Sequence, residues 1–112
     1  MLDLVIIGGS SAGSAAGIYA ARRGLKFKLL TKDFAGELAT SGEIGNWPGT
    51  IKIDGVELAG KFRAHLESYK IDMEDGVEVT QIEKQADGSF KINDTYETRT
   101  VILATGAHPR EL

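Results

Sequence analysis

The alternation of apolar and polar stretches predicts an α/β domain that opens with a strand, a turn and a helix. Leu2–Ile7 is a compact apolar run, as expected for a strand that is buried on both faces of a parallel sheet. Glycine and serine residues end this run, and a helix is expected over about residues 11–23. Because Lys26–Thr31 is a second predicted strand, the opening of the chain should form a βαβ unit with a right-handed crossover.

Small residues dominate the first predicted helix. A stripe at helical spacing consists of Ala12, Ala15, Ala16, Tyr19 and Ala20. Gly13 and Gly17, four residues apart, lie on one side and should let the helix sit close to a sheet. Gly24 follows the helix and is a natural C-terminal cap.

A long loop and a second helix follow. From Lys32 to Thr50 the apolar residues recur with neither helical nor strand spacing, which predicts a long loop. A loop of such length in a compact domain is usually functional. The second helix is expected to begin at Asp54, which has capping-box spacing to Glu57. Apolar residues then recur at helical spacing and should bury one face of this helix. They are Ala59, Phe62, Leu66 and Tyr69.

The last part of the chain predicts strands. The candidates are Val77–Lys84, Ser89–Ile92, Tyr96–Arg99 and Thr100–Thr105. The turn signals Asp87-Gly88 and Asn93-Asp94 separate the first three, which predicts a β-meander. The fourth is an apolar run and predicts another buried strand of the sheet.

Composition narrows the classes of function. The 13 basic and 16 acidic residues give a net charge of −3, and no basic cluster interleaves with aromatic residues, so nucleic acid is not an expected partner. The sequence has no cysteine, which excludes a disulfide, a thiolate metal site and a dithiol redox centre within it. Leu2–Ile7 is too short to cross a bilayer and lacks the basic flank of a signal peptide. We therefore expect one cytoplasmic domain over residues 1–112, without a membrane segment.

The sequence contains no pattern that assigns a catalytic or metal-binding residue. No metal-ligand spacing and no Ser/His/Asp arrangement is legible in the sequence. His65 is expected on the outer, solvated face of the second helix. His108 precedes a proline near the predicted ligand edge and is a weak acid–base candidate.

The turn after the first strand is the first candidate for binding chemistry. A strand that ends at a helix amino terminus directs unpaired N–H groups and the positive end of the helix dipole at one spot, where a diphosphate can bind. In the fingerprint G-x-G-x-x-G, Gly8 and Gly13 take the first and third glycine positions, but Ser10 takes the second. The Ser10 hydroxyl either donates a hydrogen bond to phosphate, or its Cβ pushes the phosphate away. The structural alternative is that Ser10 or Ser11 simply caps the helix.

Other strand ends and loops are weaker candidates. The second strand ends in Thr31-Lys32-Asp33, where dinucleotide folds hold the ribose hydroxyls, although Asp33 is equally well explained as a solvated loop charge. Ala104-Thr105-Gly106 is again a strand end followed by glycine. Glycines in the long loop permit close approach of a flat ligand, whereas Trp47-Pro48 is best explained as packing that anchors the loop.

Three segments together resemble one family. The segments DLVIIGGSSAGSAAGIYAARRGL, LLTKDFAGELATSGEIGNWPG and VILATGAHPREL are similar, in order and spacing, to the first portion of thioredoxin reductase and its flavoprotein relatives. The resemblance implies a Rossmann-like FAD/NAD(P)-binding fold, with a parallel sheet, flanking helices and a small β-meander. It also implies a non-covalently bound FAD that accepts a hydride from NADPH and passes electrons through a cysteine pair to a disulfide partner.

The resemblance also implies where FAD would lie. Gly8, Gly9, Ser10, Ser11, Ala12 and Gly13 would cradle the diphosphate, and Thr31 and Lys32 would lie by the adenosine ribose. Gly36, Glu37 and Asn46 would line the flavin end, Val79 would lie by the adenine, and Ala104, Thr105 and Gly106 would lie along the cofactor.

The sequence departs from the family pattern at four positions. Ser10 replaces the second glycine, Ser11 stands where proline is common, and Gly45 replaces a glutamate before the Asn-Trp-Pro-Gly run. Glu37 replaces a glutamine that typically contacts the flavin ring. An ionised glutamate can only accept hydrogen bonds, and its charge disfavours the anionic reduced flavin.

The family pattern also includes parts that this sequence does not contain. These are the NADPH-binding domain with the cysteine pair and a returning segment that completes the sheet, so the fold is expected to be incomplete relative to the family. Uncovered sheet surface favours self-association, and a homodimer is predicted. The first hypothesis is therefore the FAD-binding portion of a flavoprotein oxidoreductase. A non-catalytic, Rossmann-like nucleotide-binding or assembly module is the alternative, and a simple nicotinamide dehydrogenase is disfavoured.

Overall fold

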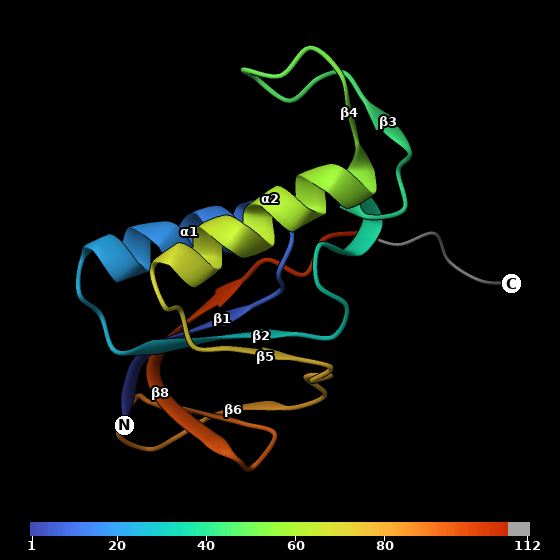
Figure 1. The fold of residues 1–112 in the computed structure, drawn as a ribbon. Helices are drawn as coiled ribbons and strands as arrows, with labels where there is room; N and C mark the ends of the chain where they lie inside the picture. The colour runs from blue at the N-terminus through green and yellow to red at the C-terminus, as the bar shows by residue number, and fades with distance from the viewer. Residues whose placement is uncertain (108–112) are drawn as a thin grey trace, which may run out of the picture.

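The computed structural model describes residues 1–107, which fold as a twisted six-stranded sheet with two helices on one face and an arm that projects from the body (Figure 1). The strand order is β5-β2-β1-β8-β7-β6. The elements are β1 Leu2–Ile7, α1 Ser11–Arg22, β2 Phe27–Thr31, the 3-10 helix η1 Gly36–Leu38, β3 Glu43–Ile44, β4 Ile53–Asp54, α2 Gly55–Ser68, β5 Met73–Asp75, β6 Ile82–Lys84, β7 Phe90–Ile92 and β8 Tyr96–Leu103.

The parallel half of the sheet confirms the predicted βαβ unit. β1 lies between β2 and β8, with Ile6 opposite both Leu29 and Ile102, and all of these strands run parallel. Parallel strands that are covered on both faces need apolar runs, which Leu4–Ile7 supplies in β1 and Leu29-Leu30 in β2, where both runs are buried. The carboxyl ends of β1, β2 and β8 consequently meet at one edge of the sheet.

The antiparallel half confirms the predicted meander with changed boundaries. β6 pairs with β7 and β7 with β8. The strand predicted over Val77–Lys84 forms only at Ile82–Lys84, because residues 77–81 leave the sheet. The two last predicted strands are one continuous strand, β8, since no turn residue interrupts Arg99-Thr100.

Two parts of the fold were not predicted from the sequence. β5 adds to the free edge of β2 in parallel, with Leu29 opposite Met73. The stretch from Lys32 to Thr50, in which no element was predicted, contains η1 and β3, and β3 pairs with β4 as the base of the projecting arm (Figure 1).

The first helix packs through its glycines and not through the whole predicted stripe. Gly13, Gly17 and Ala20 are buried, whereas Tyr19 is 70% exposed, and Ala12 and Ala15 are also exposed. A Cβ on Gly13 would lie 1.8 Å from the Gly8 carbonyl oxygen. The close approach of α1 to the turn after β1 therefore determines which face of the helix meets the sheet. The number of apolar residues on each face does not predict this.

The second helix begins one residue after its predicted start. Asp54 is the N-cap, and its carboxylate accepts a hydrogen bond from the Val56 N–H at 3.2 Å. Leu58, Ala59 and Leu66 are buried, and Phe62 is half-buried. Tyr69 was expected on the apolar face but is exposed, because it is the C-cap residue and stacks on His65 at 5.9 Å between ring centroids.

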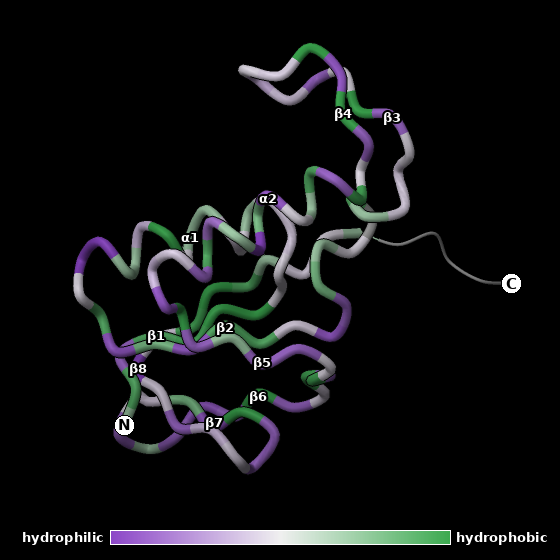
Figure 2. Tube along the Cα trace, in the orientation of Figure 1, coloured by the Kyte–Doolittle hydropathy of each residue, from purple (hydrophilic) through white to green (hydrophobic). Residues whose placement is uncertain are grey.

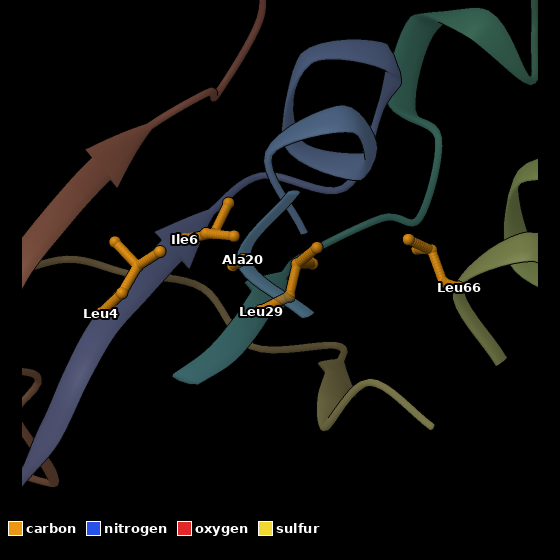
Figure 3. Packing of buried hydrophobic residues seen from close by; sticks show 5 residues of the cluster. All are labelled: Leu4, Ile6, Ala20, Leu29 and Leu66. Atoms are coloured by element: carbon orange, nitrogen blue, oxygen red, sulfur yellow. The ribbon is translucent and has the colours of Figure 1, made fainter. Parts of the chain in front are cut away.

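Apolar clusters cover both faces of the central strands. On the helical face, Leu4 and Ile6 of β1 and Leu29 of β2 meet Ala20 of α1 and Leu66 of α2 (Figure 3). On the other face, the buried residues are Val5, Ile7, Leu30 and Ile92. The hydropathy colouring accordingly shows green segments in the middle of the molecule, where the central strands lie, interrupted by purple at their charged residues (Figure 2).

Neither helix within residues 1–107 is long and apolar enough to cross a membrane. The same residues contain no group of three or more histidine or acidic side chains that would hold a metal ion.

Candidate functional site

The candidate site is a cavity of about 310 Å³ at the edge where the carboxyl ends of β1, β2 and β8 meet. Open parallel sheets bind their ligands at this edge. The cavity is lined by Ile7, Gly8, Gly9, Ser10, Leu30, Thr31, Lys32, Asp33, Gly36, Val77, Glu78, Val79, Ala104 and Thr105.

The floor of the cavity is the glycine turn that joins β1 to α1. The Gly8 N–H donates to the Leu30 carbonyl and the Ala104 N–H donates to the Ile7 carbonyl, both at 2.8 Å. Gly8 has φ +113°, and a Cβ there would lie 2.0 Å from the Ala104 carbonyl oxygen. Only glycine fits this crossing, and the turn therefore brings the three strand ends together.

The amino terminus of α1 adds hydrogen-bond donors to the same place. Ser10 is the N-cap residue, and its carbonyl accepts the Ser14 N–H at 2.8 Å. Ser10 therefore takes the N-cap position, as the structural alternative stated, but its side chain makes no cap hydrogen bond. The first N–H groups of a helix have no partner within it, and the first turn of α1 carries no acidic side chain. This end of the helix therefore favours an anion.

The end of β2 supplies polar groups. Thr31 is almost fully buried, and its carbonyl accepts the Val77 N–H at 3.0 Å. Lys32 Nζ lies 3.7 Å from Glu78 Oε1, and because both side chains are 64% exposed this ion pair contributes little to stability. Asp33 is exposed and also lines the cavity, where a carboxylate can accept hydrogen bonds from sugar hydroxyls.

The segment 77–79 forms the apolar wall of the cavity. Val77 and Val79 pack against the cluster that contains Ile7 and Leu30. Side chains of this kind form a slot suited to a flat ring, with polar groups at its rim.

Asn93, in the turn between β7 and β8, holds this wall in place. Its Oδ1 accepts the N–H groups of Thr80 at 2.9 Å and Gln81 at 3.2 Å. Its Nδ2 donates to the Glu78 carbonyl at 2.9 Å. The turn was predicted, but the anchoring role of Asn93 was not.

Residues 2–112 match the family model described as pyridine nucleotide-disulphide oxidoreductase. The chain belongs to this family. The F subunit of the alkyl hydroperoxide reductase of Staphylococcus aureus is 34% identical over 114 residues, which cover 98% of this chain and 22% of that protein. Its Escherichia coli counterpart is 31% identical over 116 residues, with the same shares.

Solved thioredoxin reductases show the same fold as this family member. The Lactococcus lactis enzyme superposes with a TM-score of 0.91 and 38% identity, covering 100% of this chain and 38% of the other. The T. acidophilum thioredoxin reductase superposes with a TM-score of 0.88 and 38% sequence identity, and the match covers 99% of this chain and 37% of that reductase. The resemblance and fold predicted from the sequence are thereby confirmed. The chain spans less than two-fifths of these reductases and about a fifth of the two alkyl hydroperoxide reductase relatives.

The cavity brings together most of the residues that the family resemblance singled out. Those in its lining are Gly8, Gly9, Ser10, Thr31, Lys32, Gly36, Val79, Ala104 and Thr105. Those outside its lining are Ser11, Ala12, Gly13, Asn46 and Gly106, and the side chain of Glu37 lies outside the described part of the structure. Asn46 lies in the exposed part of the arm between β3 and β4, and Gly13 is buried beneath Gly8. His65 is exposed as expected, and His108 lies outside the described residues.

Four lining residues were not assigned from the sequence: Ile7, Leu30, Val77 and Glu78. Ile7 and Leu30 carried a usable signal, since each is among the last apolar residues of a strand whose end was already a candidate. The sequence contains no signal for Val77 and Glu78. Hydrogen bonds to the Thr31 carbonyl and from the Asn93 side chain hold these two residues at the cavity, and both partners are distant in the sequence.

The ionisable groups with perturbed pKa values lie outside the cavity lining. Lys28 Nζ contacts Asp72 at 2.9 Å and Glu74 at 3.2 Å, and the hydrogen bond to Asp72 is the main cause of its raised pKa. Burial raises the pKa of Tyr96, and so does its hydrogen bond to Glu74. Through these contacts Lys28 of β2 is linked to Glu74 of β5, and Glu74 to Tyr96 of β8. None of these three residues lines the cavity.

Proposed function

We propose that this chain binds FAD in the cavity and forms the FAD-binding portion of a thioredoxin-reductase-like flavoprotein. The observation that carries the proposal is the cavity itself, in which an anion-binding helix end, an apolar slot and hydroxyl-binding groups lie together. Membership of the pyridine nucleotide-disulphide oxidoreductase family supports the choice of ligand, because this family binds FAD.

The lining residues fit the adenosine diphosphate half of FAD. The first turn of α1 and Gly9 would meet the diphosphate, where the close crossing at Gly8 leaves the backbone accessible. Thr31 and Asp33 would accept or donate hydrogen bonds at the ribose, and Val77 and Val79 would contact the adenine. No added basic side chain is needed to hold the diphosphate.

The flavin half has fewer partners in this cavity. Gly36 lines it, but Asn46 is on the exposed arm. We therefore infer that most of the binding free energy comes from the adenosine diphosphate half and that the flavin ring extends toward η1.

A bound flavin would accept a hydride from NAD(P)H and pass electrons to a disulfide. The sequence contains no cysteine, so any disulfide chemistry would use sulfur atoms from outside these residues. The contribution of this chain would be to hold and orient the cofactor.

A non-catalytic assembly module is the second candidate, and one observation favours it. β1 pairs with one edge of β8, and β7 pairs with the opposite edge only at Tyr96–Thr98. Within residues 1–107, no strand pairs with that opposite edge at residues 100–103. Ile102 is 40% and Leu103 is 66% exposed. A homodimer that covers this edge remains a prediction, and the mass in solution tests it: a strict monomer at high concentration would count against it.

Titration of the purified chain tests the main proposal. FAD should bind with a change in flavin fluorescence, ADP should compete, and riboflavin, which lacks the diphosphate and adenosine, should bind much more weakly. Absence of FAD binding at saturating concentration would rule out the proposal for this chain.

A further inference from the structure

We propose that the Ser10 hydroxyl donates a hydrogen bond to the diphosphate of the bound dinucleotide and thereby replaces the contact that the missing second glycine would allow. The inference rests on the proposed function, because it names the group that makes a serine compatible with that site.

The position of the Ser10 side chain allows this contact. Ser10 lies at the amino end of α1 with φ −102° and ψ −150°, is half-buried and lines the cavity. Its carbonyl closes the first turn of the helix through the Ser14 N–H. The backbone of Ser10 is thus committed to the fold, and its side chain is free to face a ligand.

The hydroxyl of Ser10 is available as a donor. A serine N-cap ordinarily accepts a hydrogen bond from an N–H of the first turn. Here no such bond forms, and within residues 1–107 the Ser10 hydroxyl has no hydrogen-bond partner. Since it does not act as an acceptor for the helix, it can donate in the same direction as the free N–H groups of that turn.

The neighbouring glycine, Gly9, cannot take over the role of the missing one. A Cβ on Gly9 would lie 3.0 Å from Thr31 Cβ and Oγ1 and 3.2 Å from Phe34 Cδ1. The Gly9 carbonyl also accepts the Ala35 N–H at 2.7 Å. The side of Gly9 on which a Cβ would stand packs against the end of β2, so Gly9 can contact the diphosphate only through its other side, and approach of the ligand near position 10 depends on Ser10.

The full chain and four variants test the proposal by titration with FAD and with ADP. Ser10→Ala keeps the Cβ and removes the donor, so both ligands should bind about 10-fold more weakly, as for loss of a charge-assisted hydrogen bond. Ser10→Gly removes donor and Cβ together and restores close backbone approach, so affinity should stay within about 3-fold of the parent. Ser10→Thr retains the hydroxyl and should also stay within about 3-fold.

Ser14→Ala is the matched control. Ser14 lies one turn further along α1, is buried, and does not line the cavity. Its loss of a hydroxyl should leave FAD and ADP affinity unchanged. The circular dichroism spectrum of each variant checks that it is folded.

The outcomes separate the inference from the proposed function. If Ser10→Ala binds FAD and ADP with unchanged affinity, the inference is overturned and the proposed function stands. The same holds if Ser10→Gly binds these ligands more tightly than both the parent and Ser10→Ala do. That result would identify the Ser10 Cβ as an obstruction. If the parent does not bind FAD but Ser10→Gly does, the inference falls together with FAD binding by the parent chain, and the Ser10 Cβ is identified as the group that blocks the cavity. If neither binds, both fall.

Discussion

The turn before α1 and the arm between β3 and β4 are both rich in glycine, but for different physical reasons. In the turn, a Cβ at Gly8 would lie 2.0 Å from the Ala104 carbonyl oxygen, and a Cβ at Gly13, in the part of α1 that packs on the turn, would lie 1.8 Å from the Gly8 carbonyl oxygen. In the arm, a Cβ at Gly45 would meet only the Ile51 carbonyl oxygen, at 3.7 Å. Packing therefore requires the glycines of the turn, whereas the contacts of this structure do not require Gly45. Glycine content alone does not distinguish a ligand cradle from a surface arm.

A third glycine turn is held in another way. Asp87 Oδ1 accepts hydrogen bonds from the Ser89 N–H at 2.9 Å and from Ser89 Oγ at 2.6 Å, and nothing lies within 4 Å of a Cβ on Gly88. The molecule thus contains a turn whose glycines are required by packing, a turn held by side-chain hydrogen bonds, and an arm that packs through Trp47 on Phe62 but does not require glycine at position 45. Each class predicts a different response to substitution.

The largest effect is expected at Gly13. Gly13→Ala forces backbone to move at the point where α1 crosses the turn, so the free energy of unfolding should fall by about 3 kcal/mol or more. Urea unfolding measures it. The matched control is Gly60→Ala on the exposed face of α2, where nothing lies within 4 Å and alanine should stabilise by about 0.5–1 kcal/mol. Loss of less than about 1 kcal/mol in Gly13→Ala would remove the contrast between the turn and the arm.

The next effect is expected at Asn93. Asn93→Gly removes the hydrogen bonds to residues 78–81 and relieves the positive φ of +51°, so about 2 kcal/mol should be lost and FAD affinity should fall. Asn93→Asp keeps the acceptor for Thr80 and Gln81 and should be less affected. Urea unfolding and FAD titration are the measurements. A stable Asn93→Gly variant with unchanged affinity would show that the cavity wall needs no anchor.

A smaller, pH-dependent effect is expected at Asp87. Its pKa is lowered chiefly by the hydrogen bond from Ser89 Oγ and also by the Ser89 N–H. A lowered native pKa contributes stability above the ordinary carboxyl range, and that contribution is lost as the pH falls through the native value. Asp87→Asn should therefore lower the urea midpoint at pH 7, and the difference from the parent should shrink toward pH 3. Asp94→Asn, in the next turn, is the control, and an equal difference at both pH values in Asp87→Asn would contradict the assignment.

The smallest effect is expected in the arm. Gly45→Ala should change the free energy of unfolding by no more than about 0.5 kcal/mol, since its Cβ meets only one atom at van der Waals distance. Gly49→Ala, where φ is +92°, should cost about 1 kcal/mol through backbone strain alone. Urea midpoints again decide, and a large loss at Gly45 would show that the arm is constrained as the turn is.

The elements that the sequence predicted well are those with a strong local pattern. β1, α1, β2 and α2 have short apolar runs or helical periodicity; the bounds of the first three and the start of α2 were placed within a residue of those observed. β5 was missed because Met73–Asp75 is short and mostly polar, and its pairing depends on the free edge of β2. Tertiary contacts determine such an edge strand, and local propensity does not reveal them.

The candidate site was predictable where a motif marks a strand end and not elsewhere. Gly8, Thr31 and Ala104 were assigned because each lies at the end of an apolar strand or directly after it. Glu78 was missed because a distant side chain, Asn93, brings its segment to the cavity. In α1, the prediction that Gly13 and Gly17 lie on the side that meets the sheet is confirmed, whereas Tyr19 of the apolar stripe is exposed.

The position of β1 in the sheet has a consequence for how the molecule acquires its structure. Its strand partner β8 is paired in the register Leu2 opposite Thr98. β1 gains this second neighbour only after the chain has been synthesised through Thr98. Such distant pairing slows folding, and a nascent chain interrupted before Tyr96 would display one bare flank of β1 to chaperones or proteases.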